Sequence, residues 1–231
     1  MAKILFVVTG VDHWTLADGT RHPTGFWAEE AVAPYEEFTR AGHEVVVATP
    51  GGVVPTVDQG SLSPDANGGQ EGAERMSAAL ASFTELEHPV RLEDVDLADY
   101  AAVFYPGGHG PMEDLSVDAD SGRLITRALD SGTPLGVVCH APAAFLAATR
   151  EDGAHAVAGH RITGFTNAEE RQAGFADKAS WLLQDRLTEA GAAFQEGEPW
   201  APHVVVDGTL VTGQNPASSA PLAVELLKKL A

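Results

Sequence analysis

The chain has 231 residues, 44% of them hydrophobic, and its 14 basic and 33 acidic side chains give a formal net charge of −19. This length suffices for one large domain with a substantial core, so we expect residues 1–231 to form a single domain. The negative charge argues against nucleic acid as a partner. A single cysteine excludes an intrachain disulfide and a multi-cysteine zinc site, which fits a cytoplasmic location. We expect no signal peptide and no membrane partner, because no apolar run is long enough.

Strand-like and helix-like segments alternate along the chain. In chain order, the patterns predict a strand over 3–9, a helix over 26–40, a strand over 43–49, a loop over 53–72, a helix over 73–83, a strand within 98–105, a helix over 120–131 and a strand over 134–139. There follow a helix over 141–148, a strand over 161–164, a helix over 175–190, a hairpin of strands over 203–206 and 209–212, and a helix over 216–230. This alternation favours an α/β fold in which helices sandwich a mostly parallel central sheet. Whether the loop over 53–72 closes over a site is left open.

The lone cysteine, Cys139, stands between a predicted strand and a predicted helix, and His140 follows it directly. At such a turn the sulfur points out of the sheet near the positive end of the helix dipole, which favours the thiolate. The thiolate is the nucleophilic form of cysteine, so this turn predicts nucleophilic chemistry. The alternative is that Cys139 is a small buried hydrophobic residue without a chemical role.

Three segments follow predicted parallel strands, namely Thr9–Val11, Pro106–Gly110 and Cys139-His140. Ligands of open parallel sheets bind beyond the carboxyl ends of the strands, so we expect these segments to meet at one site. Glycine lets the backbone approach a substrate closely, and the amides of Gly108 and His140 are candidates for an oxyanion hole. The alternative for the glycine pair is an ordinary turn.

Carboxylates are candidates to assist the sulfur at two places. Glu30 lies on the first predicted helix among aromatic residues, where burial would raise its pKa and suit it to proton exchange with a thiol. One of Glu169 and Glu170, which follow a short predicted strand, is a candidate to orient His140 in a Cys–His–acid arrangement. The alternatives are a solvated glutamate at position 30 and an acidic cluster at a helix start over 169–170.

The sequence shows no signature of a bound metal or nucleotide. Its histidines do not fall at metal-ligand spacings such as i, i+4 on one helix. It contains no Walker-type loop, and no G-x-G-x-x-G motif follows the first strand. We therefore expect no metal and no cofactor.

These residues together resemble the ThiJ/PfpI superfamily, which has a flavodoxin-like, class I glutamine-amidotransferase-like fold. The matching segments are Lys3–Thr9, Thr24–Glu30, Ala41–Val45, Pro106–Gly110, Val137–Pro142 and Gly213–Ser219. They span nearly the whole chain in the order of the superfamily. The segments that begin at Thr24, Pro106 and Gly213 are most similar to the glyoxalase III-type, chaperone-like branch.

The resemblance implies roles for individual residues. Cys139 would be the nucleophile and His140 its neighbouring base. Glu30 would be the carboxylate that touches the thiol, and Glu170 would be the acid behind the base. Glu169 is the alternative to Glu170, because the register is uncertain by one position. The resemblance also implies an oxyanion hole from the backbone of Gly108 and His140, and a homodimer.

The implied reaction is the cofactor-free, glutathione-independent conversion of methylglyoxal, a small 2-oxoaldehyde, to lactate, as in a hydro-lyase of the D-lactate dehydratase type. Cys139 would form a hemithioacetal, Glu30 or His140 would move a proton from C1 to C2 through an enediolate, and water would hydrolyse the thioester. Three alternatives stay open. They are a cysteine peptidase or amidase on the same nucleophile, a protein deglycase or holdase, and a redox sensor in which Cys139 is oxidised to a sulfinic acid.

Overall fold

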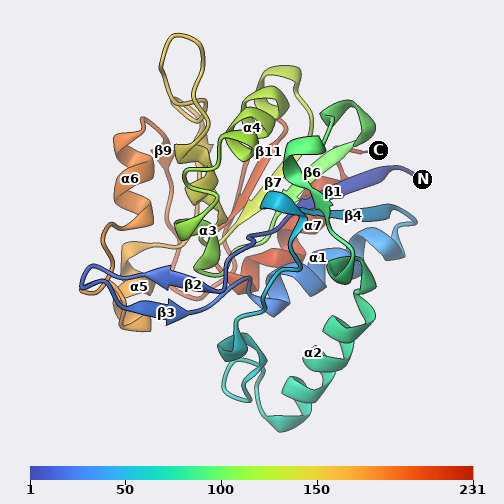
Figure 1. Ribbon diagram of the computed structural model, residues 1–231, viewed down its shortest axis with the longest axis vertical. Helices are drawn as coiled ribbons and strands as arrows, with labels where there is room; N and C mark the ends of the chain where they lie inside the picture. The colour runs from blue at the N-terminus through green and yellow to red at the C-terminus, as the bar shows by residue number, and fades with distance from the viewer. Residues whose placement is uncertain (231) are drawn as a thin grey trace.

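A seven-stranded sheet forms the centre of the molecule (Figure 1), and the computed structural model describes residues 1–230. Its strand order is β10-β11-β7-β6-β1-β4-β5. The edge strand β10 runs antiparallel to β11, and the other neighbouring pairs are parallel. The strands are β1 (Lys3–Val7), β4 (Glu44–Thr49), β5 (Val90–Arg91), β6 (Ala102–Tyr105), β7 (Leu135–Val138), β10 (Val204–Asp207) and β11 (Leu210–Gly213). The carboxyl ends of the parallel strands therefore meet at one edge of the sheet.

Two small sheets and a set of helices surround the central sheet. The small sheets are the antiparallel hairpin of β2 (His13–Thr15) and β3 (Arg21–Pro23) and the parallel pair β8 (Arg161–Ile162) and β9 (Ala193–Phe194). The α-helices are α1 (Ala28–Arg40), α2 (Gln70–Ser82), α3 (Gly110–Glu113), α4 (Ala119–Ser131), α5 (Asn167–Ala173), α6 (Leu183–Glu189) and α7 (Ser219–Leu227). Short 3-10 turns include η2 (Gln59–Leu62), η6 (Ala141–Leu146) and η7 (Pro216–Ser218). Among the described residues, no helix has both the length and the apolar character needed to span a membrane.

Helices cover both faces of the central sheet, so the predicted α/β fold with a mostly parallel sheet is confirmed. The helices α1 and α7 pack together on one face, and α4 lies on the other beside η6 (Figure 1). Gly136 of β7 faces α7, and a Cβ there would lie 2.9 Å from Leu222 and 3.1 Å from Leu226. The missing side chain therefore lets α7 approach the sheet closely.

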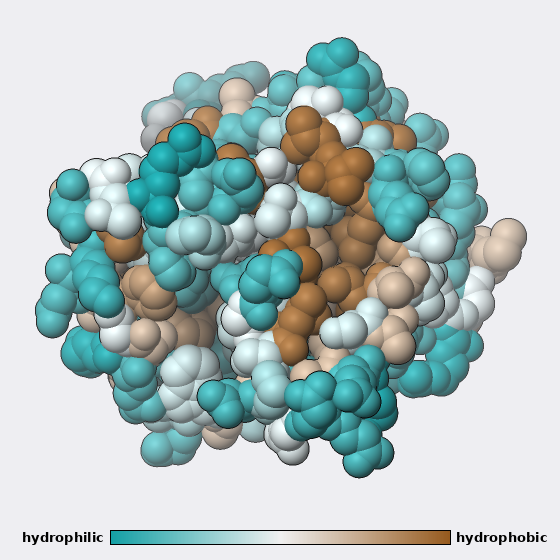
Figure 2. Space-filling model, turned by 60° about the horizontal axis from the view of Figure 1, so that its bottom comes forward, coloured by the Kyte–Doolittle hydropathy of each residue, from teal (hydrophilic) through white to brown (hydrophobic). Residues whose placement is uncertain are grey.

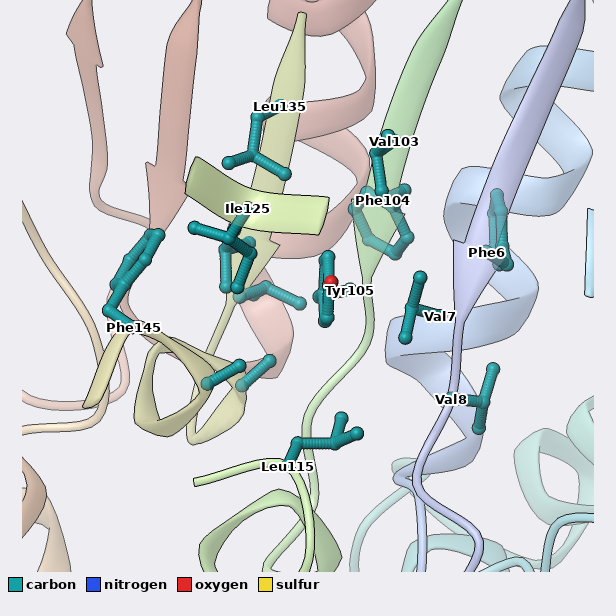
Figure 3. Close-up of a cluster of buried hydrophobic side chains, with 14 of the residues drawn as sticks. Phe6, Val7, Val8, Val103, Phe104, Tyr105, Leu115, Ile125, Leu135 and Phe145 are labelled. Carbon is teal, nitrogen blue, oxygen red and sulfur yellow. The ribbon is translucent and has the colours of Figure 1, made fainter. Parts of the chain in front are cut away.

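Aromatic and branched side chains fill the space between the sheet and its helices (Figure 3). The ring of Phe6 on β1 lies 4.8 Å from that of Phe104 on β6, and it meets Phe38 of α1 edge-on at 5.8 Å. Tyr105 points to the opposite face, where its hydroxyl lies 3.2 Å from the hydroxyl of Ser121 on α4. Because β1, β6 and β7 are buried on both faces, their sequences are nearly continuous apolar runs.

The structure differs from the predicted elements at several places. The helix predicted over 175–190 is wrong in its first half, because α6 begins at Leu183. The preceding segment turns back, since the amide of Ala17 donates to the carbonyl of Lys178 at 2.8 Å and ties it to the β2–β3 hairpin. The segment over 141–148 forms the 3-10 turn η6 instead of an α-helix. The β2–β3 hairpin itself has no counterpart among the predicted elements.

Replacing Phe104 with alanine tests the central aromatic cluster. We expect the free energy of unfolding to fall by about 3–5 kcal/mol, because the variant loses apolar burial and leaves a cavity beside Phe6 and Phe38. Denaturant unfolding followed by circular dichroism measures the change. The control Val117→Ala, at an exposed position, should change it by less than about 0.5 kcal/mol. A loss below about 1 kcal/mol for Phe104→Ala would contradict this packing.

Candidate active site

Cys139 lies at a strained turn just after β7. Its φ of 60° falls in the left-handed region that residues with a side chain rarely adopt. Two backbone hydrogen bonds hold it there, because its amide donates to the carbonyl of Gly213 at 2.9 Å and its carbonyl accepts from the amide of Phe165 at 2.7 Å. The residue is 3% exposed and lines a pocket beyond the carboxyl ends of the strands.

The carboxyl group of Glu30, in the first turn of α1, lies beside the thiol. Glu30 is fully buried, and its Oε2 accepts a hydrogen bond from the amide of Gly107 at 2.7 Å. A Cβ at position 107 would lie 2.6 Å from this oxygen and 2.9 Å from the Cβ of Cys139, so the close approach requires glycine. A hydrogen-bonding contact with the thiol lowers the pKa of Glu30 and raises that of Cys139, so the two groups lie side by side.

His140 and Glu170 continue the chain of contacts behind the sulfur, and His109 joins it. The Nδ1 atom of His140 lies 3.3 Å from Cys139 Sγ, and its Nε2 lies 2.7 Å from Oε2 of Glu170. The other oxygen of Glu170 lies 3.1 Å from Nε2 of His109, whose ring stacks on Trp14 at 4.5 Å. Both histidines therefore direct one nitrogen at the same carboxylate.

This shared carboxylate fixes the tautomer of His140. Burial opposes ionisation of Glu170, but the neighbouring His140 and hydrogen bonds from both histidines hold its pKa well below the usual range. An ionised carboxylate can only accept hydrogen bonds, so each histidine donates from Nε2. Burial, and then the proximity of His140, lower the pKa of His109 and keep it neutral. A neutral His140 that donates from Nε2 to Glu170 has its lone pair on Nδ1, 3.3 Å from Cys139 Sγ, where it can accept the thiol proton.

Glu169 faces away from the sulfur and anchors the surrounding backbone. Its Oε2 accepts from the amide and the hydroxyl of Thr166 at 3.0 and 2.8 Å, which forms a capping box at the start of α5. Its Oε1 accepts from the amide of Trp200 at 2.9 Å and from Nδ2 of Asn215 at 2.8 Å. Of the two neighbouring glutamates, Glu170 therefore contacts the histidine and Glu169 holds three segments together.

The amide of Gly108 faces the sulfur, and its hydrogen bond lowers the pKa of the Cys139 thiol, partly offsetting burial. Gly108 has a φ of 90°, and a Cβ there would lie 2.4 Å from the carbonyl oxygen of Gly25. Only glycine fits this position without a shift of the backbone. The structure thus brings one of the two predicted oxyanion-hole amides to the sulfur, and the amide of His140 belongs to the same turn.

The protonation of Cys139 differs from the expected thiolate at neutral pH. Burial, followed by the charge of Glu30, raises the pKa of the thiol well above its usual value. Burial also raises the pKa of Glu30 to about 8, although the thiol and the amide of Gly107 oppose the shift. The expectation fails because η6 is a short 3-10 turn, whose dipole cannot offset the burial of the sulfur. Near neutral pH both groups keep their protons, and a first loss near pH 8 leaves one proton shared between them.

The sulfur lies at the floor of a pocket of about 500 Å³, which Glu30, Gly108 and His140 also line. The loop over 53–72 supplies one wall through residues 56–60. The amide of Phe26 donates to the carbonyl of Thr56 at 2.9 Å, which ties this wall to the segment before α1. The end of the molecule with β2, β3 and α2 comes forward in Figure 2, where apolar side chains lie in the middle of a largely hydrophilic face.

The segment Thr9–Val11 meets the Pro106–Gly110 segment, since a Cβ at Gly110 would lie 2.5 Å from Thr9, but it does not line this pocket as expected. Thr9 and Gly10 instead turn toward Asp114, donating to its carboxylate from Oγ1 at 2.8 Å and from the amide at 2.7 Å. Burial raises the pKa of Asp114 to about 6, against the effect of these hydrogen bonds. The segment therefore braces the chain after α3 from outside the pocket.

Several pocket residues carry no signal in the sequence. His109 belongs to the motif that supplies Gly108, but a single histidine in a loop has no recognisable spacing, and only the fold brings it to Glu170. His109, His140 and Glu170 present metal-ligand atom types within 4.8 Å of one another, an arrangement that no linear pattern indicates. In this structure each histidine hydrogen-bonds to Glu170 through its Nε2 atom. Trp200 reaches the pocket from an irregular loop without any periodic pattern.

Comparison with known proteins identifies the family. Residues 23–229 match the DJ-1/PfpI family. The chain belongs to this family. It is 31% identical to Glyoxalase 3 of Candida albicans, with 98% of each protein covered. It is 30% identical to the glutathione-independent glyoxalase HSP31 of Saccharomyces cerevisiae, covering 99% of this chain and 98% of that protein. The crystal structure of glyoxalase III from Candida albicans superposes on this chain with a TM-score of 0.85 and 31% sequence identity. The match covers 99% of this chain and 97% of that chain. The resemblance seen in the sequence is therefore confirmed.

Replacing Glu30 with glutamine tests the shared proton. In the unchanged protein we expect the rate of iodoacetamide alkylation of Cys139 to rise in two steps, the lower one near pH 8. In Glu30→Gln no carboxylate charge opposes the thiolate, so the rate should rise in one step, below the upper step of the unchanged protein. Mass spectrometry measures the rate at the single cysteine. The control Glu29→Gln should keep both steps, and a two-step profile in Glu30→Gln would contradict the coupling.

Proposed function

We propose that the chain is a glutathione-independent glyoxalase of the glyoxalase III type, a hydro-lyase that converts methylglyoxal and water to lactate without a cofactor. The observation that carries the proposal is the chain of contacts that joins Glu30, Cys139, His140 and Glu170 at the floor of the pocket. This arrangement combines a nucleophile with two groups that can carry protons. The full-length relatives that are named glyoxalases support the substrate class.

The first step is addition of sulfur to the aldehyde. Nδ1 of His140 accepts the thiol proton while the bond between Sγ and C1 of the substrate forms. The aldehyde oxygen then carries the negative charge, and the amides of Gly108 and His140 would donate hydrogen bonds to it. Return of the proton to this oxygen gives a neutral hemithioacetal on Cys139.

The second step moves hydrogen from C1 to C2, and Glu30 is suited to it. A carboxyl group with a pKa of about 8 is a stronger base than an ordinary glutamate once it is ionised, and it returns a proton readily near neutral pH. Removal of the proton from C1 gives an enediolate, and protonation at C2 gives a thioester. C1 is oxidised and C2 is reduced by the same amount, so no external redox partner is needed.

The third step is hydrolysis of the thioester. His140, oriented by Glu170, removes a proton from water, and the hydroxide adds to C1 of the acyl group. The bond between C1 and sulfur breaks, Cys139 leaves as a thiolate and recovers a proton, and lactate is released. The three steps sum to methylglyoxal plus water giving lactate.

The direct test is to incubate the purified protein with methylglyoxal in the absence of glutathione and to assay lactate and its chirality. Replacing Cys139 with alanine should lower kcat/KM at least about a thousandfold, because no other cysteine is present to form the thioester. Val117→Ala, at an exposed position, is the matched control and should keep normal turnover. Lactate formation by Cys139→Ala at a near-normal rate would rule out the scheme.

Variants of the adjacent residues Glu169 and Glu170 distinguish a role in the reaction from a role in stability. In Glu170→Gln an amide replaces the carboxylate that accepts hydrogen bonds from both histidines, and an amide NH2 group cannot accept one. His140 then loses its orientation, and kcat should fall about a hundredfold or more. Glu169→Gln sets an amide against donors from Thr166, Trp200 and Asn215, so the free energy of unfolding should fall by about 2 kcal/mol.

Lactate assays and denaturant unfolding on both variants distinguish the two effects. A reversal, with Glu169→Gln the inactive but stable variant, would show that the roles are misassigned.

A cysteine peptidase or amidase would use the same nucleophile and base, and a deglycase would release lactate from an adduct on a protein. Incubation of the same preparation with peptides, with glutamine and with a methylglyoxal-treated peptide separates these activities from the glyoxalase reaction. Faster turnover of any of them than of free methylglyoxal would replace the proposal. The homodimer stays a prediction, which sedimentation equilibrium tests.

A further inference from the structure

The pocket above Cys139 is much larger than methylglyoxal requires. Methylglyoxal has three carbons and two oxygens, so it fills on the order of 100 Å³, judged from the volume of a water molecule. The pocket measures about 500 Å³, which lies in the range of sites for considerably larger ligands. With the aldehyde carbon fixed at the sulfur, most of this space is left for the group attached to C2.

Aromatic side chains from separate segments form the walls of this space. Phe165 and Trp200 meet edge-to-face, with 5.5 Å between their ring centroids and 72° between their planes. Phe175 lines the pocket together with His109, and their rings lie 5.2 Å apart. Trp27 adds a further indole beside the floor. Such ring faces and edges suit a flat apolar group, which stacks on them at little cost in conformational entropy.

Trp200 is a second, independent indication that a ligand covers this surface. The side chain is 45% exposed although it is large and hydrophobic, and the residue has a φ of 64°, which a side chain makes unfavourable. Its amide donates to Glu169 at 2.9 Å and its indole Nε1 donates to Gln172 at 2.6 Å, so the ring is held in place. A strained, fixed and exposed aromatic ring at a pocket is a feature that folding alone does not require.

The charges around the pocket select against an anionic substituent. The carboxylates of Asp12 and Asp58 belong to its lining, and no lysine or arginine occurs among the described residues that line it. His22 lies there as well, but burial lowers its pKa, so it supplies little positive charge near neutral pH. An uncharged group at C2 is therefore favoured over a carboxylate or a phosphate.

We infer that the preferred substrates are 2-oxoaldehydes that carry a flat, uncharged aromatic group at C2, with Trp200 as the residue that sets this preference. The inference rests on the proposed glyoxalase function and narrows its substrate class. The chemistry is unchanged: sulfur adds to the aldehyde carbon, hydrogen moves from C1 to C2, and water releases a 2-hydroxy acid. Phenylglyoxal, the simplest such compound, would give mandelate.

The test compares kcat/KM for phenylglyoxal and for methylglyoxal without glutathione, with mandelate and lactate as the measured products. We expect phenylglyoxal to be favoured at least about tenfold, because the ring buries apolar surface that a methyl group does not. Trp200→Gly removes the ring and relieves the strain at this φ, and it should lower the preference at least about fivefold. Trp200→Phe keeps a ring and should retain most of it.

A matched control accounts for the different intrinsic reactivity of the two aldehydes. Trp181 is partly buried outside the pocket, beside Arg186, so Trp181→Ala should leave the ratio of the two kcat/KM values unchanged. As a binding test free of aldehyde chemistry, acetophenone should inhibit methylglyoxal turnover competitively and at much lower concentration than acetone. Thermal unfolding of each variant verifies that it is folded at the assay temperature.

Two results would overturn the inference. One is a ratio near one in the unchanged protein, and the other is a preference that does not respond to Trp200→Gly. If methylglyoxal is still converted to lactate in either case, the proposed function stands and only the substrate class is wrong. If neither aldehyde is converted, the proposed function and the inference fail together.

Discussion

The rest of the site depends on the burial of the Cys139 thiol beside the Glu30 carboxyl. Both groups are removed from water, so neither ionises readily while the other is charged, and their protons are coupled. The carboxyl thereby becomes a base of moderate strength at about pH 8, which an exposed glutamate is not. In the proposed reaction the sulfur would thus have a neighbour that takes and returns protons at the carbon to which it adds. A solvated thiol with an ordinary glutamate would provide neither property.

The surrounding backbone keeps this pair together. The positive φ at Cys139 aims the sulfur away from the sheet, and glycines at positions 107 and 108 let the neighbouring loop approach within contact distance. Glu169 accepts four hydrogen bonds, and Asn215 also donates to the carbonyl of Ala201 at 2.8 Å. A network so fully satisfied in a dry interior is rigid, which suits residues that must act at fixed distances. The result is a buried floor beneath a wide aromatic pocket.

The sequence predicts the scaffold better than the site. Continuous apolar runs, glycine stops and the Asp207-Gly208 pair are local signals, so the main parallel strands and several helices are predictable from them. The turn that carries Cys139 and the glycines of the Pro106–Gly110 segment are predictable as well. The pairing of His109 with Glu170, and the position of Trp200, depend on distant segments meeting in space, which no local pattern records. The helix-dipole argument predicts a thiolate at Cys139, but burial dominates the pKa of the thiol and raises it.

The most direct measurement of the central claim is mass spectrometry of protein quenched in acid during turnover of methylglyoxal. The account predicts a lactoyl group on the peptide that contains Cys139, present during turnover and lost once methylglyoxal is consumed. Acid stabilises a thioester and releases a hemithioacetal, so the adduct would mark the acyl intermediate itself. Steady lactate production with Cys139 unmodified throughout, or with the acyl group on another residue, would contradict a nucleophilic role for the sulfur.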